Sequence, residues 1–300
     1  MSVSSDFYDI VFIGHMCFDE IQSYQGKSCI APGSAVLCGA VAAARVGKRV
    51  LVVTRMALQD DEILALLRQN GIAVYVIPAK ETTYMKVVHP SANVDERQIF
   101  QIKNAGFFSL PDMPTLAARR VHLAGITDQE FTIGFISGLK KKGFRLSADM
   151  QSFVRQVQPP DGNIDFQDVP NKQDIVRLLD MVKLDIVEAK VLTGTDDMEQ
   201  AALTFETWGC PEILITSADG VLARVNGMTH YEKFSNQSVA GRTGRGDTTF
   251  AAYLARRLDH SVTESLKFAA ALVSLKMETP GPFGGTMADV LARMQAKHVN

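Results

Sequence analysis

The stretch Gly241-Arg-Thr-Gly-Arg-Gly-Asp-Thr-Thr-Phe-Ala-Ala-Tyr-Leu254 joins a glycine-punctuated turn to the start of an apolar helix. Gly244 and Gly246 allow the backbone to approach a ligand closely and to adopt positive φ angles. The apolar residues from Phe250 onward recur at helical spacing, so the turn leads into a helix N-terminus. Unpaired amide groups and the positive end of the helix dipole at such a terminus favour a bound anion.

Asp247 lies in this turn, where a carboxylate has two interpretations. Beside a bound anion it can remove a proton from a nucleophile that attacks the anion, which is the arrangement of a phosphoryl-transfer site. Followed by Thr248 and Thr249, it can equally belong to an ordinary capped helix start. The residues of this turn alone leave both interpretations open.

The composition favours a protein that acts on small molecules. The 300 residues, 46% of them hydrophobic, suffice for one large α/β domain, and a formal net charge of −2 provides no basic surface for nucleic acid or membrane. No apolar run reaches the roughly 18 residues of a membrane span, and the first residues lack the pattern of a signal peptide. The four cysteines form no Cys-x-x-Cys pair, so we expect free thiols in a cytoplasmic protein rather than a zinc site.

Short apolar strands alternate with helical patterns along most of the chain. Strands are predicted over 9–15, 49–54, 120–124, 144–149, 185–187 and 212–216, and helices over 35–46, 61–70, 130–141, 197–208, 263–277 and 287–297. This alternation predicts an α/β fold, with a doubly wound, mostly parallel sheet and helices on both faces. A hairpin is predicted over 220–234, around Asn226-Gly227.

Residues 20–30 and 73–102 are β-branched and alternate in polarity, which predicts a small accessory sheet. Their apolar positions exceed what so thin a layer can bury. We therefore expect a lid over the substrate face that a ligand closes or a second subunit covers, as in a homodimer. Residues 158–172 are predicted to form a long surface loop, and residues 1–300 a single domain.

The segment around Asp247 resembles the C-terminal signature of the ribokinase-like (pfkB-type) carbohydrate kinases, usually Asp-Thr-Thr-Gly-Ala-Gly-Asp-Thr-Phe. The matching positions are Thr243, Gly244, Gly246, Asp247 and Thr248. Gly241 replaces the first aspartate, and Arg245 replaces the alanine. The resemblance covers nearly the whole chain and implies an ATP-dependent kinase. In it Asp247 is the catalytic base and the backbone of Gly244, Arg245 and Gly246 binds the transferring phosphoryl group.

The same resemblance extends to segments near the first strand. Asp19, four residues after Gly14-His15, matches the family's sugar-binding aspartate. Pro32–Cys38 resembles the substrate motif Gly-Gly-x-x-x-Asn, with Gly33 matching, Ser34 in place of the second glycine and Cys38 in place of the asparagine. A cysteine lacks the paired donor and acceptor of an amide, which argues against ribose as substrate. A surface aspartate and a glycine turn before a core helix would explain these residues as well.

Asp149-Met-Gln-Ser-Phe-Val-Arg155 closely resembles the Asp-x-Gln-x-x-x-Arg segment of the inositol-kinase-like branch. The resemblance implies that Asp149, Gln151 and Arg155 lie at the substrate, where an amide and a guanidinium can bind polyol hydroxyls or phosphate oxygens. Inositol or a similar polyol is therefore favoured. As an alternative, Arg155 is a solvated helix residue.

Two further segments resemble donor-binding motifs. Asp185-Ile-Val-Glu188 stands at the Asn-x-x-Glu motif and implies that Glu188 acts on Mg²⁺ through water, with Asp185 replacing the asparagine. Thr216-Ser-Ala-Asp-Gly220 resembles the nucleotide loop Thr-x-Gly-x-x-Gly. The implied ATP contacts are Thr216, Ser217, Gly220 and Thr243, with an adenine pocket from residues 269–281 and K⁺ as a further candidate cofactor. Exposed acids at a strand end are the alternative for Asp185 and Glu188.

The sequence leaves two functions open. One is an ATP-dependent kinase for a small sugar, polyol or nucleoside, with Arg245 either gripping the phosphoryl group or facing an acid such as Asp19. The other is a catalytically weak or inactive nucleotide- or metabolite-binding protein on the same fold, because Cys38, Ala218 and Gly241 depart from the motifs. The intact Asp247 favours the kinase.

Overall fold

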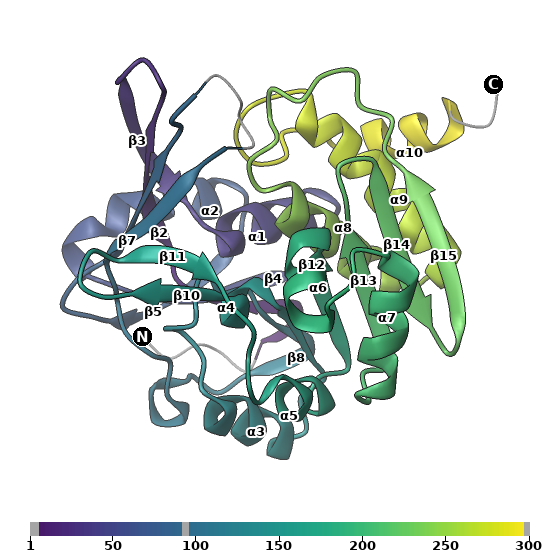
Figure 1. Cartoon of the computed structure of the whole chain (residues 1–300), viewed down its shortest axis with the longest axis horizontal. Helices are drawn as coiled ribbons and strands as arrows, with labels where there is room; N and C mark the ends of the chain where they lie inside the picture. Colours follow the sequence, from purple (N-terminus) through teal and green to yellow (C-terminus); the bar gives the residue numbers. More distant parts are fainter. Residues whose placement is uncertain (1–5, 92–95, 297–300) are drawn as a thin grey trace.

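The computed structural model describes residues 6–91 and 96–296, and in these ranges its main body is a nine-stranded sheet (Figure 1). Its strands, in sheet order, are β15 (Met228–Lys233), β14 (Gly220–Val225), β13 (Glu212–Thr216), β12 (Met181–Asp185), β9 (Leu146–Asp149), β8 (Ala117–Leu123), β1 (Phe7–Ile13), β4 (Val50–Met56) and β5 (Ala73–Pro78). Neighbouring strands are parallel except where β14 pairs with β13 and β15. The predicted mostly parallel sheet is confirmed.

Helices cover both faces of this sheet, because its central strands are apolar on both sides and need two covering layers. One face packs against α1 (Ala35–Arg45), α2 (Ala65–Gln69), α8 (Arg245–Arg257), α9 (Val262–Met277) and α10 (Met287–Ala296). The other packs against α3 (Ile133–Lys141), α5 (Lys172–Arg177), α6 (Ile186–Thr193) and α7 (Met198–Thr207). The helix predicted over 61–70 is instead a 3-10 turn, η1 (Leu58–Leu64), followed by the short α2; a second such turn, η2, spans Leu110–Asp112.

The hairpin predicted around Asn226-Gly227 is confirmed. Val225 of β14 faces Met228 of β15, and the two residues between them have φ angles of 51° and 77°. Positive φ at both central residues is the geometry of a tight two-residue hairpin turn, which asparagine and glycine adopt most readily.

The predicted accessory sheet, here called the lid, is present on the left side of Figure 1. Its strands, in sheet order, are β10 (Arg155–Gln158), β11 (Asn163–Phe166), β7 (Gln98–Lys103), β6 (Thr83–Val88), β2 (Cys17–Gln22) and β3 (Ser28–Gly33). Two expectations are wrong here. β5 belongs to the main sheet, because it runs parallel to β4 after a helical crossover, and an edge strand alternates in polarity as a lid strand does. The predicted loop 158–172 contains β11, which pairs with β10 and joins the lid.

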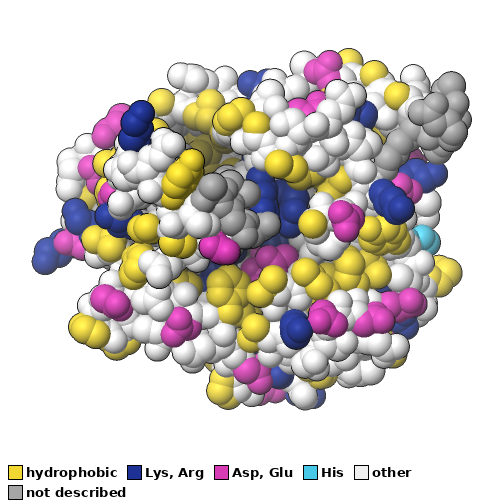
Figure 2. All heavy atoms as spheres, turned by 45° about the horizontal axis from the view of Figure 1, so that its top comes forward, with side chains coloured by type: hydrophobic (Ala, Val, Ile, Leu, Met, Phe, Trp, Pro, Cys, Tyr) yellow, Lys and Arg dark blue, Asp and Glu magenta, His cyan; other side chains and the backbone are white. Residues whose placement is uncertain are grey.

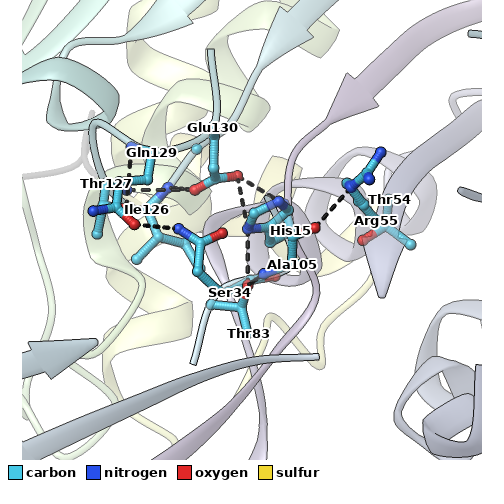
Figure 3. A network of polar contacts seen from close by, with 12 residues as sticks. His15, Ser34, Thr54, Arg55, Thr83, Ala105, Ile126, Thr127, Gln129 and Glu130 are labelled. Carbon is cyan, nitrogen blue, oxygen red and sulfur yellow. Dashed lines mark hydrogen bonds and ion pairs between the residues drawn. The ribbon is translucent and has the colours of Figure 1, made fainter. Parts of the chain in front are cut away.

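A buried polar network ties the lid to the end of β1 (Figure 3). Glu130 accepts hydrogen bonds from the amides of His15 at 2.9 Å, Thr127 at 3.3 Å and Ile126. The His15 ring contacts the Gly106 carbonyl through Nε2 and the Thr83 hydroxyl of β6 through Nδ1, both at 2.9 Å. Because a carbonyl can only accept, Nε2 carries the proton, and burial lowers the pKa of this neutral histidine.

Three sequence expectations involve residues outside the described ranges. The leader-peptide expectation concerns residues 1–5, part of the lid expectation concerns 92–95, and the last helix was expected to end at Lys297; all three lie outside the described residues. Among the helices of the described ranges, none combines the length and apolar character that crossing a bilayer requires.

Candidate active site

The carboxyl ends of three neighbouring strands bring the predicted site residues together. Asp149 of β9 is paired in register with Lys183 of β12, and Asp185 of β12 with Thr216 of β13. Open α/β sheets bind ligands at this edge. Figure 2 shows a hollow near the centre of one face of the molecule, in which basic and acidic side chains lie side by side.

The Gly244–Asp247 turn leads into α8 as predicted. Gly244 has a φ of 76°, and a Cβ atom at this position would lie 2.5 Å from the Cys38 Sγ, so only glycine fits. The Arg245 amide donates to the Arg242 carbonyl at 3.1 Å and closes the turn. The amides of Gly246 and Asp247 are in the first helical turn, which has no intrahelical acceptors for them. Of the main-chain amides expected to bind an anion, those of Gly246 and Asp247 are therefore the ones available.

Lys183, which sequence reasoning missed, lies beneath this turn. Its Nζ atom is 2.8 Å from Asp149 Oδ2 and 3.9 Å from Glu188 Oε2, and a Cβ atom on Gly246 would lie 2.7 Å from it. Burial opposes its charge, but the carboxylates of Asp149 and Glu188 raise the pKa of Lys183 overall. Lys183 therefore remains a cation, and the only signal for it was a lysine within an apolar strand.

Glu188 and Asp185 form the capping box of α6. Asp185 Oδ1 accepts from the amides of Val187 and Glu188 at 2.9 Å, and Glu188 Oε2 accepts from the Asp185 amide at 2.8 Å. Burial raises the pKa of Glu188, and the neighbouring Asp185 charge raises it further. Among the described residues Glu188 Oε1 has no hydrogen bond, and the Arg155 guanidinium lies 3.7 Å away.

This arrangement bears on the expected Mg²⁺ contact. Within 6–91 and 96–296, no three histidine, cysteine or acidic side chains are grouped so as to hold a metal ion directly. The unsatisfied Oε1 of Glu188 fits a contact to Mg²⁺ through water, since Mg²⁺ keeps much of its water shell. Asp185 is occupied with capping the helix.

The Asp149–Arg155 segment contacts Asp247 through Gln151. The Gln151 amide group donates to the Gly125 carbonyl at 2.8 Å and lies 3.5 Å from Asp247 Oδ1. Asp149 is buried, and its Oδ1 atom accepts a hydrogen bond from the main-chain amide of Gln151 at 3.1 Å. Arg155 begins β10, after the one-turn helix α4 (Gln151–Val154), and its guanidinium lies over the Phe166 ring. Its interpretation as a solvated helix residue is therefore wrong.

On the acceptor side, Asp19 of β2 lies against the main chain of Gly33 and accepts from the Cys17 thiol at 3.3 Å. Burial, and to a smaller extent the charge of Asp247, raises the pKa of Asp19 to about 6. Burial and Asp247 also raise the pKa of the Cys38 thiol to about 12, so Cys38 stays neutral. Both shifts indicate that these residues and Asp247 share one site.

Ser34, which stands where the family motif has a glycine, has an unusual backbone geometry. Its φ and ψ angles of 144° and 166° lie in a region that is populated almost only by glycine. The Ser34 hydroxyl accepts from the Leu37 amide at 3.0 Å and thereby caps α1. A strained backbone therefore follows Gly33, the residue against which Asp19 packs.

The expected donor-side residues have separate roles. Thr216 is buried at the end of β13, and its hydroxyl has no hydrogen-bond partner within the described ranges. The Ser217 hydroxyl accepts from the Gly220 amide at 3.2 Å and closes the turn between β13 and β14. Residues 269–277 of the expected adenine pocket are mostly buried in the core against α8.

Lys276 of α9 is the second site residue that sequence reasoning missed. Its side chain is 1% exposed, and its Nζ atom donates to the carbonyls of Gly241 and Thr243. Thr243 thus contacts a lysine through its main chain. The signal was again a lysine in a mostly apolar stretch, here the second half of α9.

Comparison with known proteins gives similarities over nearly the whole chain. The model of the pfkB family of carbohydrate kinases matches residues 8–286. A cytidine kinase of Thermococcus kodakarensis is 25% identical over 254 residues, covering 82% of this chain and 87% of that protein. A pyrophosphate-dependent kinase of the ribokinase family, solved with a pyrophosphate analog and myo-inositol, is 32% identical with a TM-score of 0.86, covering 94% of this chain and 99% of that chain. Arabidopsis thaliana ribokinase shares the fold, with 18% identity, a TM-score of 0.76 and coverage of 97% and 99%.

Proposed function

Because this chain belongs to the pfkB family of carbohydrate kinases, we propose that it transfers a phosphoryl group to a hydroxyl of a small polyol such as inositol. The observation that carries the proposal is the position of Asp247. Its carboxylate stands in the first turn of α8, 3.5 Å from the Gln151 side-chain amide, and its charge acts on both Asp19 and the buried Lys183. A base in this position can serve a hydroxyl that attacks a phosphate bound at the helix N-terminus.

The proposed reaction is a direct displacement at phosphorus. The acceptor oxygen forms a bond to the phosphoryl group, the bond to the leaving phosphate breaks, and Asp247 takes the proton of the hydroxyl. The amides of Gly246 and Asp247 stabilise charge on the phosphoryl oxygens, and Arg245 adds a cation at the same turn. Gln151 orients the Asp247 carboxylate, from which it lies 3.5 Å away.

Mg²⁺ would neutralise charge between the phosphates of the donor when bound. We propose that Glu188 would contact Mg²⁺ through a water molecule bound to its Oε1 atom, which has no hydrogen bond within the described residues. Lys183 and Arg155 lie within 4 Å of the same carboxylate and limit its negative charge.

ATP is the phosphoryl donor that the sequence motifs imply, and pyrophosphate is a second candidate. Two similar solved structures, 33% and 32% identical to this chain, are of a pyrophosphate-dependent kinase of the ribokinase family. In addition, most of residues 269–277, expected to line an adenine pocket, are buried in the core. Pyrophosphate needs amide and cation contacts but no purine-binding surface, so both observations favour it.

A matrix of donors and acceptors tests the proposal. ATP and pyrophosphate are each combined with myo-inositol, ribose and cytidine in the presence of Mg²⁺, and phosphorylated products are followed by ³¹P NMR against reactions without enzyme. We expect transfer to myo-inositol from at least one donor. No transfer with any pair would favour the alternative, a binding protein that has lost turnover.

The lid is also part of the proposal, as a piece of one domain that spans residues 1–300. Its strands expose the large apolar side chains of Ile21, Ile30 and Ile102. Such a surface favours closure over a ligand or a homodimer through the lid. Light scattering at micromolar concentration tests the dimer, and a monomer would exclude it. The cytoplasmic location stays a prediction.

A further inference from the structure

The ammonium of Lys276 is buried against residues 241–243, the segment just before the Gly244–Asp247 turn. It donates to the main-chain carbonyls of Gly241 and Thr243 in this segment. Burying an ammonium is costly unless hydrogen bonds replace its water shell. Here the replacement is main-chain oxygen rather than a carboxylate, and Lys276 stands at the carbonyl end of α9, where the helix dipole favours a cation.

The same segment is clamped onto the end of α9 by its backbone. The Gly241 amide donates to the Met277 carbonyl at 2.8 Å, and a Cβ atom on Gly241 would lie 1.8 Å from the Thr279 carbonyl oxygen. No side chain fits at this contact. Gly241, which departs from the family signature, therefore allows the turn to approach Lys276 closely.

Converging carbonyl oxygens are also the ligands that proteins offer to K⁺, because they replace its hydration shell. The K⁺ that the resemblance suggested does not fit on this turn, since a side-chain cation already takes both carbonyl oxygens. We propose that the Lys276 ammonium serves as a built-in monovalent cation, which holds the Gly241–Thr243 segment and with it the anion-binding turn in shape. The enzyme then needs no K⁺.

The proposal assigns Lys276 a positioning role, because Thr243 directly precedes Gly244 and fixes where the amides of Gly246 and Asp247 point. Burial lowers the pKa of Lys276, while the charge of Asp247 opposes this shift and favours the protonated form. The rate experiments below rest on the proposed phosphoryl transfer. The melting experiments do not, so the two proposals can fail separately.

Wild-type protein gives the first test. Rates and melting temperatures are compared in KCl, NaCl and tetramethylammonium chloride at equal ionic strength. We expect the same rate and the same melting temperature in all three salts. Activation or stabilisation of wild type by K⁺ would overturn the proposal, whether or not any variant folds.

Two substitutions give the second test. Lys276→Ala removes the ammonium and leaves space for a cation, whereas Lys276→Met removes the charge but fills the space. We expect both to lower kcat by roughly 10²-fold, the cost of misplacing catalytic groups by about 1 Å. K⁺, ammonium or short alkylammonium ions should restore rate to Lys276→Ala and leave Lys276→Met unchanged.

Melting temperature supplies the readout that does not depend on activity. A cation that binds the folded state raises it, so K⁺ should stabilise Lys276→Ala but neither wild type nor Lys276→Met. Lys267→Ala is the matched control, because this lysine is on the same helix, nine residues and about 13 Å from Lys276. Lys276→Ala that gains neither rate nor stability from any cation would overturn the proposal.

Discussion

Two buried lysines contact residues 241–247, the segment that leads into α8, and they are stabilised in different ways. Lys183 reaches it from β12 and pairs with the carboxylate of Asp149 at 2.8 Å. Lys276 reaches it from α9 and binds two neutral carbonyls. The pKa of Lys183 is raised by its carboxylates against the effect of burial, whereas for Lys276 burial prevails and lowers the pKa.

The different partners of the two lysines indicate that each has a different role in the same site. Lys183 neutralises carboxylates that would otherwise repel a phosphate, so its charge is compensated within the protein. Lys276 binds the main chain just before the turn that we propose as the phosphate site. Breaking each contact should therefore have a different consequence, one mainly in stability and the other mainly in rate.

Lys183→Met should have the largest effect on stability. It leaves the buried carboxylates of Asp149 and Glu188 without their ammonium, and breaking a buried pair in this way costs about 3–5 kcal/mol. Lys276→Met leaves only neutral carbonyls unpaired, at about 1–3 kcal/mol. Urea unfolding of both variants measures the difference, and a larger loss for Lys276→Met would break the comparison.

Asp19 extends the comparison to a carboxylate whose hydrogen-bond partner is a thiol rather than an ammonium. With its pKa raised to about 6, it loses its charge as the pH falls through 6, and only the ionised form has both oxygens free to accept from substrate hydroxyls. We expect KM for the acceptor to rise as the pH falls below about 6. Asp19→Asn should abolish this inflection; an unchanged profile would assign it to another group.

Arg245→Ala should have the smallest effect. Arg245 is a half-buried cation of the same turn at a position where the family signature usually has alanine, so the chemistry does not require its charge. We expect kcat to fall by about tenfold or less, and by more than KM for the donor rises. Steady-state kinetics with saturating acceptor give both values, and an unchanged kcat would leave Arg245 a structural residue.

The sequence predicts best what is determined locally. The Gly244–Asp247 turn and the Asn226-Gly227 hairpin follow from glycine positions, and the polar residues at strand ends follow from the parallel sheet. β5 was assigned to the wrong sheet because an edge strand and a lid strand alternate in the same way. Lys183 and Lys276 were missed because their partners lie 33–35 residues away along the chain.

Those long-range contacts also changed the interpretation of predicted residues. Asp149 was expected at the substrate, yet it is buried and paired with Lys183. Thr243 was expected to contact ATP, and in the structure its carbonyl accepts a hydrogen bond from Lys276. In both cases the neighbouring cation could be found only from the packing of distant elements.

The most direct test of the central claim is the rate of Asp247→Asn. The substitution keeps the size of the side chain and removes only the base, so the melting temperature should change little. Phosphoryl transfer, measured with the best donor and acceptor pair under single-turnover conditions, should fall by roughly 10²–10⁴-fold or more. A folded variant that transfers at the wild-type rate would show that Asp247 only begins a helix, and would contradict the account.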